Sequence, residues 1–304
     1  MKSQMQRRAL LALPMAGLAA QDAVIKVNVR LVRLIVTVKD RAGQPVGTLQ
    51  KDNFQVADSG VRQELAVFEH STAQPLSVAV LIDISGSTGK DLKYEVVSVE
   101  RFLKTLFGEG NAEDRAALYS FNWEVTRQVS FTRRIDRFRK PLERLRPEAG
   151  TALYDAVYLA AQELEDRQGR KVLIVVTDGG DTTSRHSFKE SLEAVHAADA
   201  VVYPILVVPI GGETGRNVGG ENALEMFAQG TGGRVYSPRG GVELDRTFSA
   251  ILTDLRTQYL LGYYPKGLPE SKERFHPVRV ELNGAAAKQS LQVLARNGYY
   301  GDAG

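Results

Sequence analysis

Five side chains that carry oxygen atoms adjoin predicted strands and could bind a hard cation. Asp83, Ser85 and Ser87 stand at alternate positions directly after an apolar run, and Asp178 follows a second run of this kind. Thr151 lies near the start of a predicted helix. Carboxylate and hydroxyl oxygens are the ligands that Mg²⁺ prefers, and Mn²⁺ or Ca²⁺ are alternatives. The pattern therefore predicts a divalent-cation site formed by these five residues.

Each of these residues also has a purely structural interpretation. Asp83 could cap the following helix, and Ser87 and Thr151 are ordinary residues at helix N-termini. Asp178 could be a turn residue before Gly179. The combination is more specific than any single position, because three loops supply the same class of ligand. Asp181 lies outside the pattern and is either a surface turn residue or an accessory to the site.

Enzymatic motifs that resemble parts of this pattern each lack a required residue. A phosphatase of the haloacid-dehalogenase type needs a second carboxylate where Ser85 stands, and no Gly-x-Ser-x-Gly elbow surrounds this serine. A P-loop would need a glycine at Ile84 and a serine or threonine at Asp91. The chain has no cysteine, and its four histidines show no metal-ligand spacing. The sequence therefore predicts a binding protein that is not an enzyme.

The elements between residues 76 and 256 predict a doubly wound α/β domain with a mainly parallel sheet. Short runs rich in Val, Ile and Leu are typical of strands that are buried on both faces, and they occur at Ser77–Ile82, Ala116–Phe121, Val172–Thr177 and Val201–Val208. Helical patterns alternate with them, with later helices at Phe188–Ala198, Ala223–Gln229 and Leu244–Leu255 and a short strand at Arg234–Tyr236. Glu124–Phe131 is weaker and indicates an antiparallel edge strand. Because ligands bind at the carboxyl ends of strands in such sheets, the predicted cation site lies where function is expected.

Two β-rich segments flank this α/β domain. Residues 24–72 and 257–300 each show strand alternation, and neither can bury its apolar face alone. We expect the two segments to pack as one β-sandwich into which the α/β domain is inserted, with two separate β units as the alternative. A change of apolar parity near Leu31–Val32 predicts a bulge or a strand that switches sheets.

Residues 1–20 have the pattern of a secretory signal peptide. Lys2, Arg7 and Arg8 precede an apolar run from Ala9 to Ala20 that is too short to span a membrane. The alternative is a cytoplasmic N-terminus, and the arginine pair leaves the Sec and twin-arginine routes open. Cleavage of this segment would bring the formal net charge from +3 to zero, which argues against a nucleic-acid partner. We expect a secreted or periplasmic protein with no membrane span in the mature chain.

Three short motifs carry a resemblance to a known family. Asp83-Ile84-Ser85-Gly86-Ser87, Gly150-Thr151-Ala152-Leu153 and Thr177-Asp178-Gly179 together resemble the metal-ion-dependent adhesion site of von Willebrand factor type A domains. The resemblance covers roughly residues 76–255. Val46–Phe54 and Leu260–Pro265 are also similar to segments of bacterial secreted proteins related to this family.

The resemblance implies roles for the five residues and a class of partner. Ser85, Ser87 and Thr151 would hold the ion directly or through water, with Asp83 and Asp178 in supporting or direct roles. An Asp or Glu of a partner protein would complete the coordination. The resemblance thus implies a secreted, metal-dependent protein-binding or adhesion module. The alternative is a structural envelope component that binds through its β-sandwich, with a metal site that only stabilises the fold.

Overall fold

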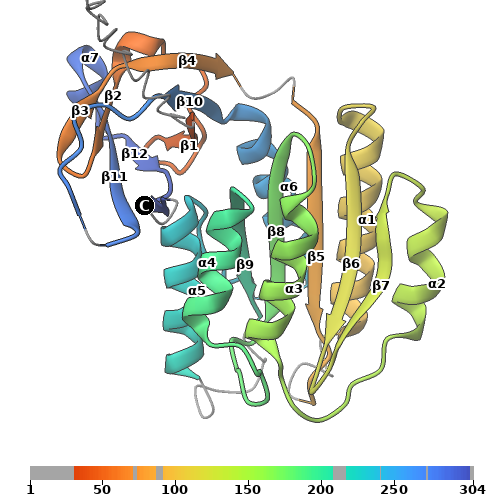
Figure 1. Cartoon of the computed structure of the whole chain (residues 1–304). Coiled ribbons are helices and arrows are strands. Elements are labelled where there is room, and N and C mark those ends of the chain that lie inside the picture. Colours follow the sequence, from red (N-terminus) through yellow and green to blue (C-terminus); the bar gives the residue numbers. More distant parts are fainter. Residues whose placement is uncertain are drawn as a thin grey trace, which may run out of the picture.

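A five-stranded sheet with helices on both faces forms the larger part of the molecule (Figure 1). The computed structural model describes residues 31–70, 74–86, 92–207, 217–239, 241–271 and 273–301. The sheet order is β7-β6-β5-β8-β9, and only β7 is antiparallel to its neighbour. The strands are β5 (Leu76–Asp83), β6 (Arg115–Phe121), β7 (Val125–Thr132), β8 (Arg170–Thr177) and β9 (Ala200–Leu206). All eight residues of β5 are buried, as its central position requires.

Helices cover the two faces of this sheet with separate apolar cores. One face is covered by α1 (Leu92–Glu109), α2 (Asp136–Arg144) and α6 (Gly241–Thr257). The other is covered by α3 (Leu153–Glu165), α4 (Phe188–Ala197) and α5 (Val218–Thr231). This arrangement confirms the predicted α/β fold class with a mainly parallel sheet.

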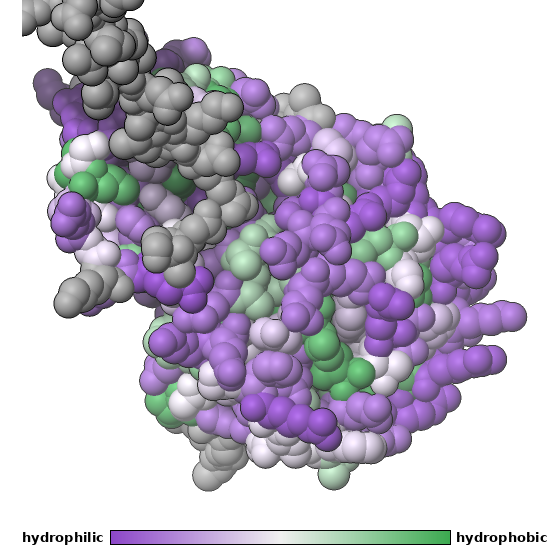
Figure 2. Space-filling model, viewed as in Figure 1, coloured by the Kyte–Doolittle hydropathy of each residue, from purple (hydrophilic) through white to green (hydrophobic). Residues whose placement is uncertain are grey.

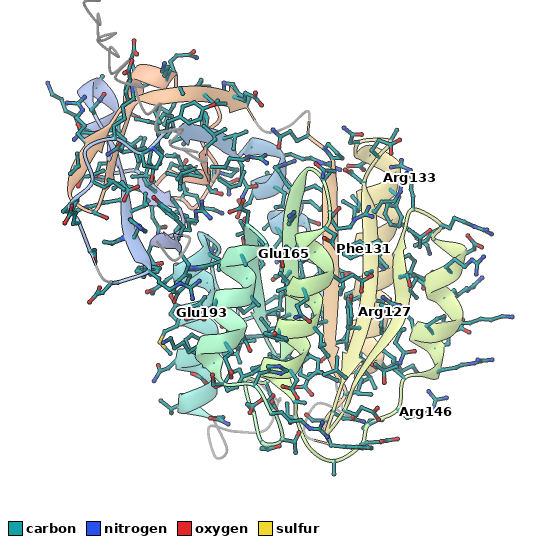
Figure 3. The ribbon with its side chains drawn as sticks, viewed as in Figure 1. Arg127, Phe131, Arg133, Arg146, Glu165 and Glu193 are labelled. Atoms are coloured by element: carbon teal, nitrogen blue, oxygen red, sulfur yellow. The ribbon has the colours of Figure 1, made fainter. Side chains whose placement is uncertain are left out.

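The edge strand β7 carries charged side chains that tie it to neighbouring elements. Arg127 and Phe131 lie along this strand at the edge of the sheet, and Arg133 directly follows its end (Figure 3). The Arg127 guanidinium lies 2.9 Å from the carboxylate of Glu163, and Arg133 donates to the carbonyl of Phe107. Charged side chains of this kind protect an exposed sheet edge from pairing with another chain. The expected antiparallel strand at Glu124–Phe131 is therefore present, displaced by one residue.

Two additional antiparallel sheets combine strands from both ends of the chain. Their orders are β12-β1-β10-β4 and β13-β11-β2-β3. One apolar core, with side chains from both sheets, lies between them. The elements are β1 (Val32–Lys39), η1 (Lys51–Asn53), β2 (Phe54–Asp58), β3 (Val61–Gln63), β4 (Leu65–His70), β10 (Tyr259–Tyr263), β11 (Phe275–Leu282), α7 (Gly284–Ala287), β12 (Gln292–Leu294) and β13 (Gly298–Tyr300).

Several local expectations differ from the structure. The strand expected at Arg234–Tyr236 is reduced to an isolated bridge between Tyr236 and Ile205, and β13 was not expected. The parity change near Leu31–Val32 depends on residues before 31, which lie outside the described part of the chain, as does the predicted signal peptide. Short strands such as β13 have too few residues to show an alternating pattern.

A buried polar network joins the two parts of the molecule at the amino end of the parallel sheet. Lys39 Nζ of β1 lies 2.6 Å from Asp254 Oδ1 of α6, and the two side chains are 2% and 1% exposed. Gln258 Nε2 donates to Thr37 Oγ1 at 3.1 Å and to the Tyr203 hydroxyl at 3.0 Å. The carboxyl ends of the parallel strands therefore lie at the opposite end of the sheet, away from the antiparallel sheets (Figure 1).

Candidate functional site

Asp83 ends β5 and is the most deeply buried of the four predicted ligands that the structure describes. Its side chain is completely buried, and Oδ1 accepts a hydrogen bond from the Ser85 amide at 2.8 Å. Oδ2 accepts from the Thr177 hydroxyl at 2.6 Å. Burial raises the pKa of the Asp83 carboxyl to about 6, although the hydrogen bonds from Thr177 and Ser85 act in the opposite direction. A nearby cation would favour the ionised form and offset this cost of burial.

Ser85 and Asp83 already contact each other. The Ser85 side chain, which is 3% exposed, makes a hydrogen bond to the Asp83 carboxyl in addition to the one from its amide. Alternation along the extended chain after β5 brings the two oxygen-bearing side chains to the same side, as the spacing predicts. Ser87 lies outside the described residues, so its place in this cluster stays a prediction.

Thr151 lies in a loop that is fixed against the ends of β5 and β6. Just before this loop, the Glu148 amide donates to the Ile84 carbonyl at 2.9 Å, and after it the Ala152 amide donates to the Asn122 carbonyl at 2.6 Å. Thr151 is 6% exposed, and among the described residues its hydroxyl has no hydrogen-bond partner. The residue does not cap α3, because Ala152 occupies the N-cap position. Its role as a ligand stays a prediction.

Asp178 follows β8 directly, and β8 is paired with β5 in parallel. Its side chain is half-buried, and its Oδ1 accepts a long hydrogen bond of 3.4 Å from the Gly180 amide. The negative charge of Asp178 contributes to the raised pKa of Asp83, although less than burial does. The two carboxylates are therefore close enough to interact, as expected for one cation site.

Thr177 is a further residue of this site that the pattern of predicted ligands leaves out. Its hydroxyl donates to Asp83 and accepts a hydrogen bond of 3.1 Å from the Gly179 amide. It thereby links the end of β5 to the loop that carries Asp178. The available signal was a polar residue at the end of an otherwise apolar strand, which is also common where a strand simply stops.

Asp181 caps a helix in this structure. Its Oδ1 accepts from the Tyr154 amide in the first turn of α3 at 3.2 Å and from the Ser184 hydroxyl at 2.5 Å. These bonds satisfy free donors at the helix N-terminus. The nearby Thr182 hydroxyl accepts from the Thr151 amide at 3.0 Å, so the loop after β8 also fixes the loop that carries Thr151.

The four described candidates suit a hard divalent cation. They offer two carboxylates and two hydroxyls, which are oxygen ligands throughout. The described part of the chain contains no group of three or more His, Asp or Glu side chains placed to hold a metal. A cation at this edge would therefore depend on the hydroxyls of Ser85 and Thr151 as well as on the carboxylates. The chemistry of these residues therefore fits a divalent ion that is bound by oxygen atoms.

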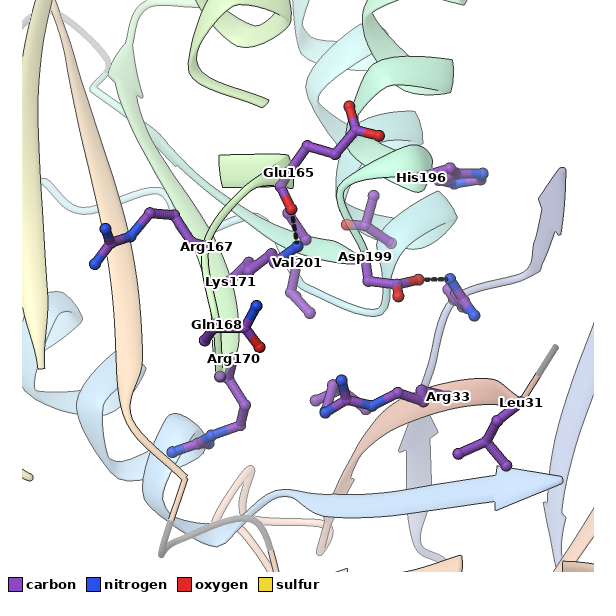
Figure 4. Close-up of a pocket in the computed structure, with 15 residues that line it drawn as sticks. Leu31, Arg33, Glu165, Arg167, Gln168, Arg170, Lys171, His196, Asp199 and Val201 are labelled. Carbon is purple, nitrogen blue, oxygen red and sulfur yellow. Dashed lines mark hydrogen bonds and ion pairs between the residues drawn. The ribbon is translucent and has the colours of Figure 1, made fainter. Parts of the chain in front are cut away.

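A separate cavity lies at the amino end of the sheet. Its volume is about 260 Å³, and charged side chains line it (Figure 4). The Arg296 guanidinium lies 2.6 Å from Asp199 Oδ1, and the Lys171 ammonium donates to the Glu165 carbonyl at 2.7 Å. These groups are already paired within the chain, which distinguishes them from the Thr151 hydroxyl at the carboxyl edge.

Comparison with known families identifies the α/β part of the molecule. Residues 78–180 match the family described as the von Willebrand factor type A domain, and this range contains all five predicted ligands. The α/β unit has the fold of a von Willebrand factor type A domain. No curated protein sequence matches the chain. In the described residues of this type A domain protein, no helix is sufficiently long and apolar to cross a membrane.

Several solved structures are similar to the chain. BatB of Bacteroides thetaiotaomicron is 20% identical, with 58% of this chain and 97% of that chain covered and a TM-score of 0.46. The vWF domain of the pilus tip protein Mfa5 of Porphyromonas gingivalis is 15% identical, with 59% of this chain and 94% of that chain covered and a TM-score of 0.47. The pilus adhesin SpaC of Lactobacillus rhamnosus GG is 9% identical, with 82% of this chain and 47% of that chain covered and a TM-score of 0.50. At such identities the similarity concerns the fold.

Proposed function

We propose that this chain is an exported protein-binding module in which a divalent cation bridges to a carboxylate of a partner protein. The observation that carries the proposal is the direct link between two strand ends at one edge of the sheet. Asp83 binds Ser85 on its own loop and Thr177 on the next strand, which leads into Asp178. Export fits the leader that the sequence predicts at residues 1–20.

The donor set explains why a partner carboxylate would bind. Asp83, Ser85, Thr151 and Asp178 would hold the ion, together with Ser87. Neutral hydroxyls add no charge, and carboxylates that act through bridging waters neutralise a divalent ion only in part, so an incoming Asp or Glu would gain a strong interaction. Asp178 is half-buried and the loops after β5 and β8 lie at the end of the sheet, so a partner can approach.

Binding is a better fit to this edge than catalysis. The hydroxyl of Ser85 faces a carboxylate that is already engaged by Thr177, so Asp83 is poorly placed to act as a free general base. The enzymatic motifs that the sequence resembles each lack a required residue. We therefore assign the edge a role in protein contact.

The first experiment measures whether the cation binds where proposed. Mg²⁺ would be titrated by calorimetry into the wild type, Asp83→Asn and Thr151→Val. Thr253→Val is the matched control, because Thr253 is exposed on α6 and its hydroxyl only bonds its own helix. We expect both site variants to remain folded by circular dichroism and to lose affinity by at least about tenfold. The control should bind as the wild type does.

The second experiment measures whether the cation is needed for partner binding. The immobilised protein would be incubated with an envelope extract in Mg²⁺ or in EDTA, and the same protein partner should be retained only in Mg²⁺ and only by the wild type. Retention that survives both EDTA and Asp83→Asn would refute the proposal. If Mg²⁺ raises the melting temperature but the partner is retained equally well without Mg²⁺, the cation is structural and the antiparallel sheets carry the interaction.

A further inference from the structure

Trp123 is the single tryptophan of the chain, and it lies at the carboxyl end of the sheet. It forms the tip of the turn between β6 and β7, where Phe121 pairs with Val125. Its side chain is 57% exposed. The other large hydrophobic side chains on the surface are scattered, and hydrophilic residues cover most of the face shown in Figure 2. A single exposed apolar residue is ordinary, so the position of Trp123 matters more than its exposure.

The strand register places Trp123 next to the loop that carries Ser85. Asp83 of β5 and Phe121 of β6 are register partners, and neighbouring strands lie about 4.8 Å apart. Both chains then continue past the sheet, and the Ile84 amide donates to the Phe121 carbonyl at 2.9 Å. Trp123 therefore lies beside the residues that follow Asp83.

The loop with Thr151 is also pressed against Trp123. A Cβ on Gly150 would lie 2.7 Å from Trp123 Cβ and 3.0 Å from its Cα, so the two backbones are in contact. The side chain of Asn122 holds the turn, because it accepts from the Glu124 amide at 2.9 Å and donates to Glu148 at 3.1 Å. The indole is thus attached to a fixed turn between two loops that supply candidate ligands.

We propose that Trp123 is the apolar anchor for the partner segment whose carboxylate reaches the cation. The partner is then a protein segment with one Asp or Glu beside an apolar or aromatic side chain. Tryptophan is enriched among the residues that dominate protein interfaces, because it buries a large area with few rotatable bonds. This inference rests on the function proposed above and adds the identity of the second contact.

The charges around Trp123 further restrict the partner. Glu124 and Glu148 are both exposed and flank the turn in sequence or by hydrogen bonding. Arg146 lies at the same end of the sheet, and its guanidinium donates to the Glu143 and Leu145 carbonyls at 2.9 and 2.7 Å (Figure 3). A second acidic residue beside the apolar anchor would meet Glu124 and Glu148 and be repelled. We therefore expect one acidic residue, an apolar neighbour and no adjacent acidic residue.

A displayed peptide library tests this specificity. Random peptides with a fixed central Asp would be selected on the wild type in Mg²⁺, with elution by EDTA. We expect selected peptides to be enriched in apolar or aromatic residues next to the Asp and depleted in further acidic residues. Trp123→Ala should lower the affinity of a selected peptide roughly 30-fold. Tyr264→Ala is the matched control, because Tyr264 is 47% exposed but follows β10 in the antiparallel part.

Fluorescence gives a second readout that depends on one residue. Because Trp123 is the single tryptophan, fluorescence excited at wavelengths longer than those that tyrosine absorbs reports on this side chain alone. We expect a selected peptide to shift the emission to shorter wavelength and to protect Trp123 from quenching by acrylamide, in Mg²⁺ but not in EDTA. Terbium bound in place of Mg²⁺ should be sensitised by Trp123, and Asp83→Asn should remove this signal.

The outcomes separate the two proposals. If acidic peptides bind in a Mg²⁺-dependent way but Trp123→Ala binds them as the wild type does, the anchor role is wrong and the cation site stands. If the emission of Trp123 stays unchanged at saturating peptide, the anchor role is also wrong. If no Mg²⁺-dependent peptide is selected and Asp83→Asn binds Mg²⁺ normally, the proposed function fails and this inference fails with it.

Discussion

Buried polar side chains lie at both ends of the parallel sheet, and they have different kinds of partner at the two ends. At the amino end, Lys39 and Asp254 form an almost completely buried ion pair, and the Tyr236 hydroxyl donates to Asp254 Oδ2 at 2.8 Å. At the carboxyl end, Asp83 is equally buried and accepts hydrogen bonds from the Thr177 hydroxyl and from the Ser85 amide and side chain. The first arrangement joins two parts of the fold, whereas Asp83 of the second is also a proposed cation ligand.

The difference shows how burial of charge can serve either the fold or binding. A buried ion pair that is fully satisfied within the chain fixes how two parts pack, although it adds little net stability. The Asp83 carboxyl is costly to bury in its ionised form, as its raised pKa indicates, and a bound cation would offset this cost. Variants at the two ends should therefore behave differently, and four of them are ordered here by expected loss of stability.

The largest loss is expected for Lys39→Met at the amino end. Removal of the ammonium leaves Asp254 as a buried charge, which costs about 3–5 kcal/mol in free energy of unfolding. Chemical denaturation measures this loss, and Mg²⁺ affinity should be unchanged because the carboxyl end is untouched. Lys104→Met is the control, because its pair with Glu100 is solvent-exposed and is worth only about 0.3–0.5 kcal/mol. Equal stability of the two variants would contradict the distinction between the ends.

The next loss is expected for Gly150→Ala at the carboxyl end. Gly150 has a φ of +84°, and a Cβ there would collide with Trp123. Left-handed strain and overpacking together should cost about 2–4 kcal/mol. Gly43→Ala is the matched control, because Gly43 has a φ of +76° but nothing within 4 Å of an added Cβ, so only about 1–2 kcal/mol is expected. Loss of Mg²⁺ affinity in Gly150→Ala alone would show that this contact also positions Thr151.

A pH-dependent loss is expected from His196 at the amino end. Burial, aided by the positive charge of Arg296, lowers the pKa of His196 from 6.5 to about 4. Between these values the unfolded chain binds a proton that the folded protein does not, so stability is complete above about pH 6.5 and falls with decreasing pH. The expected loss at pH 5 relative to pH 8 is about 2 kcal/mol.

Urea denaturation at several pH values measures the His196 contribution. His196→Gln should remove this part of the pH dependence, whereas the same change at the exposed His70 should leave it. An unchanged profile in His196→Gln would mean that other groups titrate in this range.

The smallest loss of stability is expected for Thr177→Val at the carboxyl end. Two hydrogen bonds of the Thr177 hydroxyl disappear, which costs about 1 kcal/mol. The larger effect should be on binding, because Asp83 and the loop with Asp178 lose their common link, and Mg²⁺ affinity should fall about 10–100-fold. Thr177→Ser keeps the hydroxyl and should restore binding. Failure of serine to rescue would argue that the methyl group matters more than the hydrogen bonds.

The candidate site was more predictable than the contacts that fix it. Asp83, Ser85 and Asp178 directly follow apolar strands, so the strand pattern alone places them at one edge. The role of Thr177 could not be predicted, because its partner Asp83 is distant in sequence. Asp181 proved to be a helix cap, which depends on where α3 begins in space.

The amino acid sequence by itself determined the α/β fold class and the choice of oxygen ligands, because periodicity and residue type are local properties. Only the tertiary structure decided which polar side chains find a partner within the described part of the chain. Lys39 and Asp254 are far apart in the chain and meet only when β1 packs beside α6. At the other end of the sheet, folding brings Gly150 against Trp123. The Thr151 hydroxyl has no hydrogen-bond partner among the described residues. Contacts between distant segments depend on side-chain packing in three dimensions, which local patterns do not encode.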